Sequence, residues 1–208
     1  MTNMMTFGNL EIRFDDRVLR PRPWTQAQSE WAAELAATVP DGPLLELCAG
    51  VGHLGLLLTS LTDRELVMID ADETACEFAR ANARAAGLES RVEVRHGPVD
   101  ALLDPAERFA LMLADPPWVP SRDTARYPED PGFAIDGGPD GLSVARTCVE
   151  VTARHLYPGG AAVLQLGDEG QASRLDDELA ARSGDGLRVV EVRTVPGANG
   201  VLVKLAGG

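Results

Sequence analysis

From residue 44 onward, short apolar runs alternate along the chain with segments of helical periodicity. Most of the runs are almost continuously apolar, which is typical of parallel strands buried on both faces. The predicted strands are residues 44–48, 65–69, 91–95, 109–114 and 161–166, and the predicted helices between them are 53–61, 72–86, 141–156 and 169–182. The run at 91–95 alternates in polarity, which favours a place nearer the edge of the sheet. Gly87 and Gly159 mark two expected helix ends.

The end of the chain has a different pattern. Residues 187–194 and 200–205 form two β-like runs joined by only five residues, Val195 to Asn199. So short a connection leaves no room for a crossover helix and predicts an antiparallel hairpin. We therefore expect one Rossmann-like α/β domain over residues 1–208, with a seven-stranded, mostly parallel sheet, helices on both faces and an antiparallel C-terminal hairpin.

The first 40 residues precede this core, which we place at residues 41–208. Residues 9–13 and 17–19 flank Asp15-Asp16 and predict a small hairpin, and a helix is expected over 25–38. Residues 121–141, rich in Pro, Gly and Asp, are too long for a plain connection, so we interpret them as a functional loop.

Composition and charge narrow the functional classes. The net charge is −13, and arginines gather only weakly, between residues 13 and 22. Nucleic-acid binding depends on phosphate contacts from a basic surface, so RNA or duplex DNA is disfavoured as a partner. A small-molecule, peptide or protein partner fits better, and the sequence carries no signal for an oligomeric state.

Other classes of protein are disfavoured as well. No apolar run is long enough to span a membrane, and the N-terminus does not resemble a signal peptide, so we expect a cytoplasmic protein. The three cysteines and three histidines are widely spaced, and neither a disulfide framework nor a metal site is expected.

A glycine-rich turn follows the first strand of the core. Gly50 and Gly52 are expected to turn the backbone sharply and let a ligand approach closely. Together with Gly55 they also fit a Gly-x-Gly-x-x-Gly pattern, which would suit a dinucleotide. Glu46, near the end of the strand, is instead typical of the methyltransferase loop, close to the aminoacyl end of the cofactor. The alternative is a plain strand-to-helix turn with no ligand.

Asp70 ends the next strand, twenty residues after Gly50. A carboxylate at this place can accept hydrogen bonds from the two hydroxyls of a ribose. It could instead cap the helix that follows, although Asp72 is at least as well placed for that role.

The sequence Asp115-Pro116-Pro117-Trp118 follows the fourth strand, at the carboxyl edge of the sheet, where ligands bind. Two prolines stiffen the turn and offer no amide hydrogen. The Pro116 carbonyl and the Asp115 carboxylate can then both accept hydrogen bonds from an NH₂ group, which aims the nitrogen lone pair at a methyl donor. Trp118 can stack on a flat group. The tetrapeptide is typical of N-methyltransferases, and a purely structural turn is the alternative.

These motifs resemble the HemK/PrmC-type protein-glutamine methyltransferases, a class I family that uses S-adenosylmethionine. The resemblance extends to residues 18–26, to the glycine-rich segment 134–142, and to 157–160 and 164–167. It implies S-adenosyl-L-methionine as the cofactor and Asp115, Pro116 and Trp118 as the catalytic residues. The cofactor-binding residues that it implies are Glu46, Cys48, Gly50, Gly52, Asp70, Ala71, Gly97, Pro98, Val99 and Asp115.

Three departures from that family matter. Its separate N-terminal helical domain has no counterpart in the 208 residues, and its acidic residue after the third strand is missing, with Asp100 as the candidate substitute. The family also has Asn where this chain has Asp115. Because an ionised aspartate only accepts hydrogen bonds, this change favours an amine over a carboxamide.

The sequence thus predicts an S-adenosylmethionine-dependent N-methyltransferase that acts on a planar or amine nitrogen of a small molecule or of a peptide or protein side chain. Two alternatives stay open: methylation of a base amine in rRNA or DNA, where the Asp form of the motif also occurs, and a non-catalytic cofactor-binding module. A nicotinamide-dependent oxidoreductase would leave the tetrapeptide and the terminal hairpin unexplained.

Overall fold

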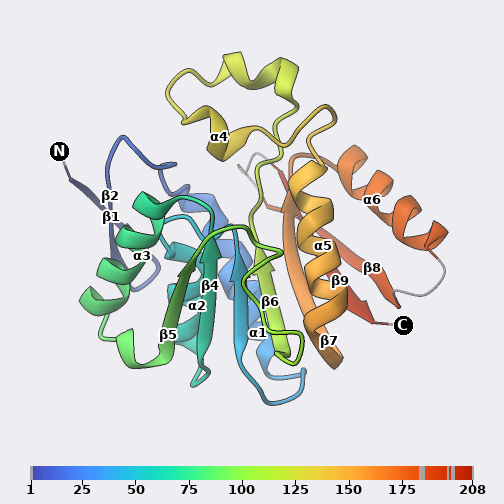
Figure 1. Ribbon diagram of the computed structural model, residues 1–208, viewed down its shortest axis with the longest axis horizontal. Helices are drawn as coiled ribbons and strands as arrows, with labels where there is room; N and C mark the ends of the chain where they lie inside the picture. Colours follow the sequence, from blue (N-terminus) through green and yellow to red (C-terminus); the bar gives the residue numbers. More distant parts are fainter. Residues whose placement is uncertain (1, 183–185, 196, 198–199, 208) are drawn as a thin grey trace.

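A computed structural model describes residues 2–182, 186–195, 197 and 200–207. Within these residues the chain forms a seven-stranded sheet in the order β5-β4-β3-β6-β7-β9-β8 (Figure 1). The first five strands in this order run parallel, and β9 is antiparallel to both of its neighbours. The strands are β3 (Leu44–Leu47), β4 (Leu66–Asp70), β5 (Val92–His96), β6 (Phe109–Ala114), β7 (Leu156–Leu166), β8 (Leu187–Thr194) and β9 (Val201–Gly207). The predicted fold class is confirmed.

Two details predicted for this sheet are also confirmed. The alternating run became β5, which lies at the edge of the sheet. The two terminal runs became the β8–β9 hairpin, paired from Leu187 opposite Gly207 to Thr194 opposite Val201. Pro196, Ala198 and Asn199 of the predicted connection lie outside the described residues.

The expected helix end at Gly159 was wrong. Helix α5 (Ser143–His155) ends four residues earlier, and Gly159 lies inside β7 with a φ of +79°. The pairing of β6 with β7 changes register there: Phe109 lies opposite Leu156, but Leu111 lies opposite Ala161. Extra residues in one strand require a bulge, and glycine adopts the positive φ of such a bulge without steric cost.

Helices cover both faces of the sheet (Figure 1). The apolar cluster on one face includes residues of α1 (Gln26–Ala36), α2 (His53–Leu61) and α3 (Glu73–Ala85), and that on the other includes residues of α5 and α6 (Glu169–Ala181). Successive strand residues point to opposite faces. Leu44 therefore belongs to the first cluster and Leu45 to the second, and both are fully buried.

Helix α3 has both of its ends encoded in the sequence. The side chain of Asp72 accepts a hydrogen bond from the Thr74 N–H at 2.9 Å, which makes Asp72 the N-cap. At the other end Gly87 has a φ of +70°, and the Leu88 N–H donates back to the Ala83 carbonyl. This is the usual glycine-terminated helix end, as predicted for Gly87.

The N-terminal hairpin lies earlier in the chain than we predicted. Strands β1 (Asn3–Phe7) and β2 (Leu10–Phe14) pair across the two-residue turn Gly8-Asn9, where the predicted turn was Asp15-Asp16. Gly8 has a φ of +59°, which suits the tight turn of a two-residue hairpin. In this register the side chains of Phe7 and Ile12 pack in the same apolar cluster as residues of α1 and α2.

Residues 121–141 extend over the carboxyl edge of the sheet, at the top of Figure 1. They contain a 3₁₀ helix, η3 (Ser121–Arg126), and the short helix α4 (Gly132–Ile135). The Gly137 N–H donates to the Val119 carbonyl at 2.8 Å and closes the loop at its base. Among the helices of the described residues, none is long and apolar enough to cross a membrane.

Candidate functional site

Two cavities open at the carboxyl edge of the sheet. We call the first, of about 610 Å³, the glycine-loop cavity; its walls include Cys48, Gly50 and Asp70. The second, of about 220 Å³, is the proline-turn cavity, whose walls include Pro116 and Trp118. The residues that line both cavities are Leu19, Asp115, Pro117 and Ala134.

Gly50 and Gly52, in the turn after β3, are each required for a different structural reason. Gly50 has a φ of +54°, and a Cβ built on it would point into open space in the glycine-loop cavity. Gly52 also has a positive φ, +81°, but a Cβ there would lie only 3.1 Å from the Met68 sulfur and 3.2 Å from the Ala79 Cβ. The structure therefore brings Gly50 to the cavity, whereas Gly52 is needed for the turn and for packing beneath it.

Glu46 lies beneath the turn, away from the walls of the cavity. Its side chain is 1% exposed and accepts a hydrogen bond from the Gly55 N–H at 3.1 Å. Burial raises the pKa of this carboxyl well above its usual value, which favours the protonated form. A Cβ on Gly55 would collide with Glu46, so Gly55 is glycine to allow this contact.

Cys48 lines the glycine-loop cavity in an unusual conformation. Among the described residues it is the only one other than glycine with a positive φ, +58°, which is sterically disfavoured for a side chain. Its sulfur lies 3.9 Å from that of Cys148 on α5. The hydrogen bond to Cys148, with burial, raises the pKa of the Cys48 thiol. The two cysteines form no disulfide with each other.

Asp70 faces the same cavity from the end of β4. One carboxylate oxygen accepts from the Gly50 N–H at 2.7 Å, and the other accepts from the Asp72 N–H at 2.8 Å. Burial raises the pKa of Asp70, and these two hydrogen bonds oppose the rise. Each carboxylate oxygen has a second lone pair, so Asp70 can still accept hydrogen bonds from a ligand. Because Asp72 caps α3, the capping role that competed for Asp70 is already filled.

A further part of the lining of the glycine-loop cavity comes from Ala71 and from the turn after β5. Pro98, Val99 and Asp100 line the cavity, and Asp100 is exposed. Gly97 does not line it, because its φ of +144° serves the turn and its Cβ position faces Leu102 at 3.2 Å.

Asp115 forms the boundary between the two cavities. It follows β6 directly and is partly buried, and no hydrogen bond to its carboxyl is found among the described residues. Burial without such a partner raises the pKa of this carboxyl to about 7. Near neutral pH Asp115 therefore exists both as a hydrogen-bond acceptor and, when protonated, as a donor.

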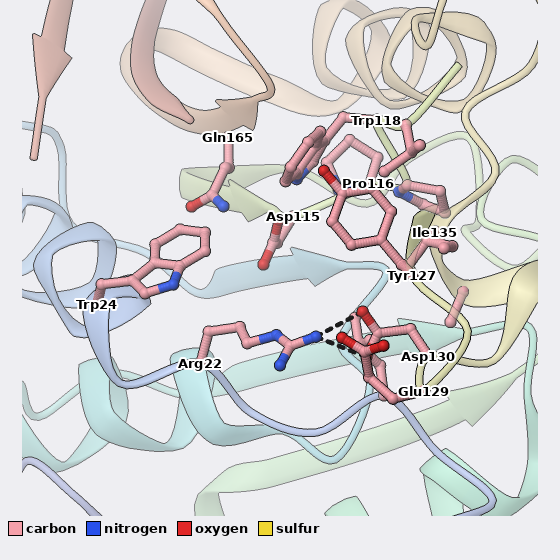
Figure 2. A pocket seen from close by; sticks show the side chains of 14 residues that line it. Arg22, Trp24, Asp115, Pro116, Trp118, Tyr127, Glu129, Asp130, Ile135 and Gln165 are labelled. Carbon is pink, nitrogen blue, oxygen red and sulfur yellow. Dashed lines mark hydrogen bonds and ion pairs between the residues drawn. The ribbon is translucent and has the colours of Figure 1, made fainter. Parts of the chain in front are cut away.

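Three aromatic side chains line the proline-turn cavity, together with charged and aliphatic ones (Figure 2). Trp118 and Tyr127 lie on one side of the Asp115 carboxyl and Trp24 on the other, with Gln165 above. Arg22 donates to both carboxylate oxygens of Asp130 at 2.5 Å, which ties the N-terminal segment to the 121–141 loop across one side of the cavity. Residues of the 121–141 loop thus line this cavity, and a functional role of the loop stays a prediction.

The sequence did not assign three of these lining residues to the site. Trp24, Tyr127 and Gln165 converge on Asp115 from separate parts of the chain. Each of the three had an indirect signal: Trp24 lies in the family-like segment 18–26, Tyr127 lies in the predicted functional loop, and Gln165 is a polar residue in the apolar second half of β7. Across the described ranges no cluster of His, Cys, Asp and Glu could hold a metal ion.

Comparison with known proteins identifies this arrangement. The family model of the methyltransferase small domain matches residues 31–127, which include β3, the glycine turn and the Asp115-Pro116-Pro117-Trp118 sequence. The match covers less than half of the 208 residues, and over them the chain is similar to the methyltransferase small domain.

Two curated relatives carry related names. A release factor glutamine methyltransferase of Deinococcus radiodurans is 34% identical over 184 residues, an alignment that covers 86% of this chain and 64% of the relative. A ribosomal protein uL3 glutamine methyltransferase of Burkholderia pseudomallei is 29% identical over 74% of this chain and 55% of its own length. The chain thus spans about three fifths of the length of the curated relatives that it matches.

Solved structures share the fold. The hMettl16 catalytic domain in complex with MAT2A 3′UTR hairpin 1 superposes with a TM-score of 0.75, covering 95% of this chain and 74% of its own. Its sequence identity is only 15%, so the likeness concerns the fold alone.

Proposed function

We propose that this protein is an S-adenosylmethionine-dependent N-methyltransferase, with the cofactor in the glycine-loop cavity and the acceptor nitrogen in the proline-turn cavity. The observation that carries the proposal is that the two cavities meet at Asp115. A methyl transfer needs donor and acceptor in contact, and this is the place where the two would meet.

The residues present fit the cofactor. Open space at Gly50 receives a ligand, and the free lone pairs of Asp70 suit ribose hydroxyls. Ala71, Pro98 and Val99 provide an apolar wall for a flat base, and Cys48 also lines the cavity. When bound, S-adenosylmethionine supplies an activated methyl group on a sulfonium. Glu46, Gly52 and Gly97 would act indirectly, by holding the turns that bring these groups together.

The protein's own contribution to the reaction is positioning. The Pro116 carbonyl and the Asp115 carboxyl accept hydrogen bonds from the N–H groups of the acceptor and aim its lone pair across the boundary toward the glycine-loop cavity. Trp118 stacks on the acceptor. The ionised form of Asp115 stabilises positive charge that develops on the nitrogen.

The size of the proline-turn cavity limits the acceptor. About 220 Å³ lies below the range usual for drug-sized ligands, so a side chain or a small molecule fits. The two curated relatives are named for glutamine in proteins, which supports a peptide or protein side chain for this chain too.

The test is methyl transfer itself. Purified protein and methyl-labelled S-adenosylmethionine are incubated with lysate fractions, and singly methylated products are sought by mass spectrometry. Asp115→Ala should lower transfer at least about a hundredfold, the scale for loss of one positioned charge-stabilising group. Asp63→Ala, which removes an exposed carboxylate outside both cavities, serves as the control. Transfer that is unchanged in Asp115→Ala, or binding of a nicotinamide cofactor in preference to S-adenosylmethionine, would overturn the proposal.

A further inference from the structure

Gln165 is a buried polar side chain for which no hydrogen bond is found among the described residues. It belongs to β7, is 1% exposed and lines the proline-turn cavity. Its side-chain oxygen has no hydrogen-bond partner, and among the described residues no hydrogen bond of its amide nitrogen is found. Figure 2 shows the carboxamide pointing into the space around the Asp115 carboxyl, between Trp24 and Trp118.

A second buried glutamine, Gln171, has the hydrogen bonds expected of a side chain with a structural role. Gln171, on α6, accepts from the Gly167 N–H at 2.7 Å and donates to the carbonyls of Trp118 and Asp140 at 3.0 and 3.2 Å. Gln171 thus joins three backbone segments, whereas within the part of the chain that the structure describes Gln165 joins none. Leaving a buried carboxamide unpaired destabilises a fold, so Gln165 is explained by a ligand that pairs with it.

We propose that Gln165 is a specificity-determining residue, whose carboxamide pairs with an acceptor group carrying N–H and C=O, or N–H and a ring nitrogen, on neighbouring positions. The inference rests on the proposed function and specifies the acceptor class of the same site. A carboxamide presents a donor and an acceptor side by side, and a flat group of this kind complements both. A simple alkyl amine offers no acceptor and leaves the Gln165 donors unpaired.

The other walls of the cavity agree with a flat acceptor. Asp115 and the Pro116 carbonyl supply acceptors for N–H on one side of the group, and Gln165 supplies the donor that an ionised Asp115 lacks. The indoles of Trp24 and Trp118 flank the space between the Asp115 and Gln165 side chains (Figure 2). Flat groups make extensive contact with aromatic rings, whereas a tetrahedral ammonium does not gain the same stacking.

The test compares two probes of similar size, propionamide and n-propylamine, with S-adenosylhomocysteine present. Binding of each probe to the whole protein is measured by saturation-transfer NMR titration. We expect propionamide to bind the wild type and to bind Gln165→Met at least tenfold more weakly. n-Propylamine should bind both proteins equally. Gln165→Glu, which keeps acceptors but loses the donor, should weaken propionamide binding as Gln165→Met does.

Stability and cofactor binding separate the possible failures. Gln165→Met should keep its affinity for S-adenosylhomocysteine within twofold and should not lower the melting temperature. Gln171→Met, the matched control, should lower it. Equal propionamide binding by wild type and Gln165→Met, or no saturable binding by the wild type, would overturn the assignment of Gln165. Failure of the wild type to bind S-adenosylhomocysteine would overturn the proposed function itself, and with it this inference.

Discussion

The carboxylate of Asp70 accepts a hydrogen bond from the backbone N–H of Gly50 at 2.7 Å. Asp70 ends β4, Gly50 lies in the turn after the neighbouring parallel strand β3, and both line the glycine-loop cavity. The acidic residue proposed for the ribose and the turn proposed for close cofactor approach are thus one hydrogen-bonded unit. A change in the position of either residue would therefore also change the contacts that a ligand makes with the other.

We therefore expect Asp70→Ala to weaken S-adenosylmethionine binding by roughly 1.5–3 kcal/mol, the scale for hydrogen bonds to a charged group. Asp70→Asn, which keeps one acceptor oxygen, should lose less. Isothermal titration calorimetry measures both variants, with Asp63→Ala as the control for the change in net charge. A loss below a few tenths of a kcal/mol would restrict Asp70 to a structural role.

Gly50→Val should abolish cofactor binding, because the side chain would occupy the cavity and strain a turn with φ of +54°. Gly87→Val is the matched control: Gly87 has a φ of +70°, open space at its Cβ position and no place in either cavity. Both variants should lose similar stability in thermal unfolding, but only Gly50→Val should lose binding in calorimetry. Equal affinity in the two variants would remove Gly50 from the site.

The raised pKa of Asp115 makes stability depend on pH. The folded protein holds this proton until about pH 7, whereas the unfolded chain releases it near 3.8. Between these values the folded state binds more protons, so the free energy of unfolding falls as the pH rises, by up to about 4 kcal/mol over the window. Asp115→Asn lacks this contribution, and its stability relative to wild type should therefore increase from pH 4 to pH 7 in urea unfolding. A constant difference between the two proteins would show that the pKa of Asp115 is ordinary.

Nucleic acid should be a poor ligand. With a net charge of −13, the protein should show weak binding to RNA hairpins and duplex DNA at physiological salt, because few phosphates can be neutralised. Fluorescence anisotropy over a salt series measures this. Tight binding with a steep salt dependence would favour methylation of a base amine over that of a side chain or small molecule.

Local patterns in the sequence were enough for much of the fold. Apolar runs of strand length, the glycines at Gly50 and Gly87, and the aspartate at Asp72 each act over a few residues, so the strands, the turn and the ends of α3 follow from neighbouring residues alone. The predicted position of the N-terminal hairpin was wrong because the sequence contains two turn signals close together. Gly8-Asn9 prevails over Asp15-Asp16 because its register buries Phe7 and Ile12, a contact with distant helices.

The sequence by itself determined the class of fold, the glycine turn of the candidate site and the place of Asp115, because each depends on a pattern of residues that are close together in the chain. Only the tertiary structure decided which residues form the proline-turn cavity. Trp24, Tyr127 and Gln165 come from the N-terminal segment, the 121–141 loop and β7, and their meeting around Asp115 depends on strand order and on the Arg22–Asp130 ion pair. It also decided that Gln165 is buried with no hydrogen bond to any described residue, while Gln171 accepts one and donates two. Hydrogen-bond satisfaction depends on which groups the whole fold brings within 3.5 Å, and the spacing of residues along the chain does not encode it.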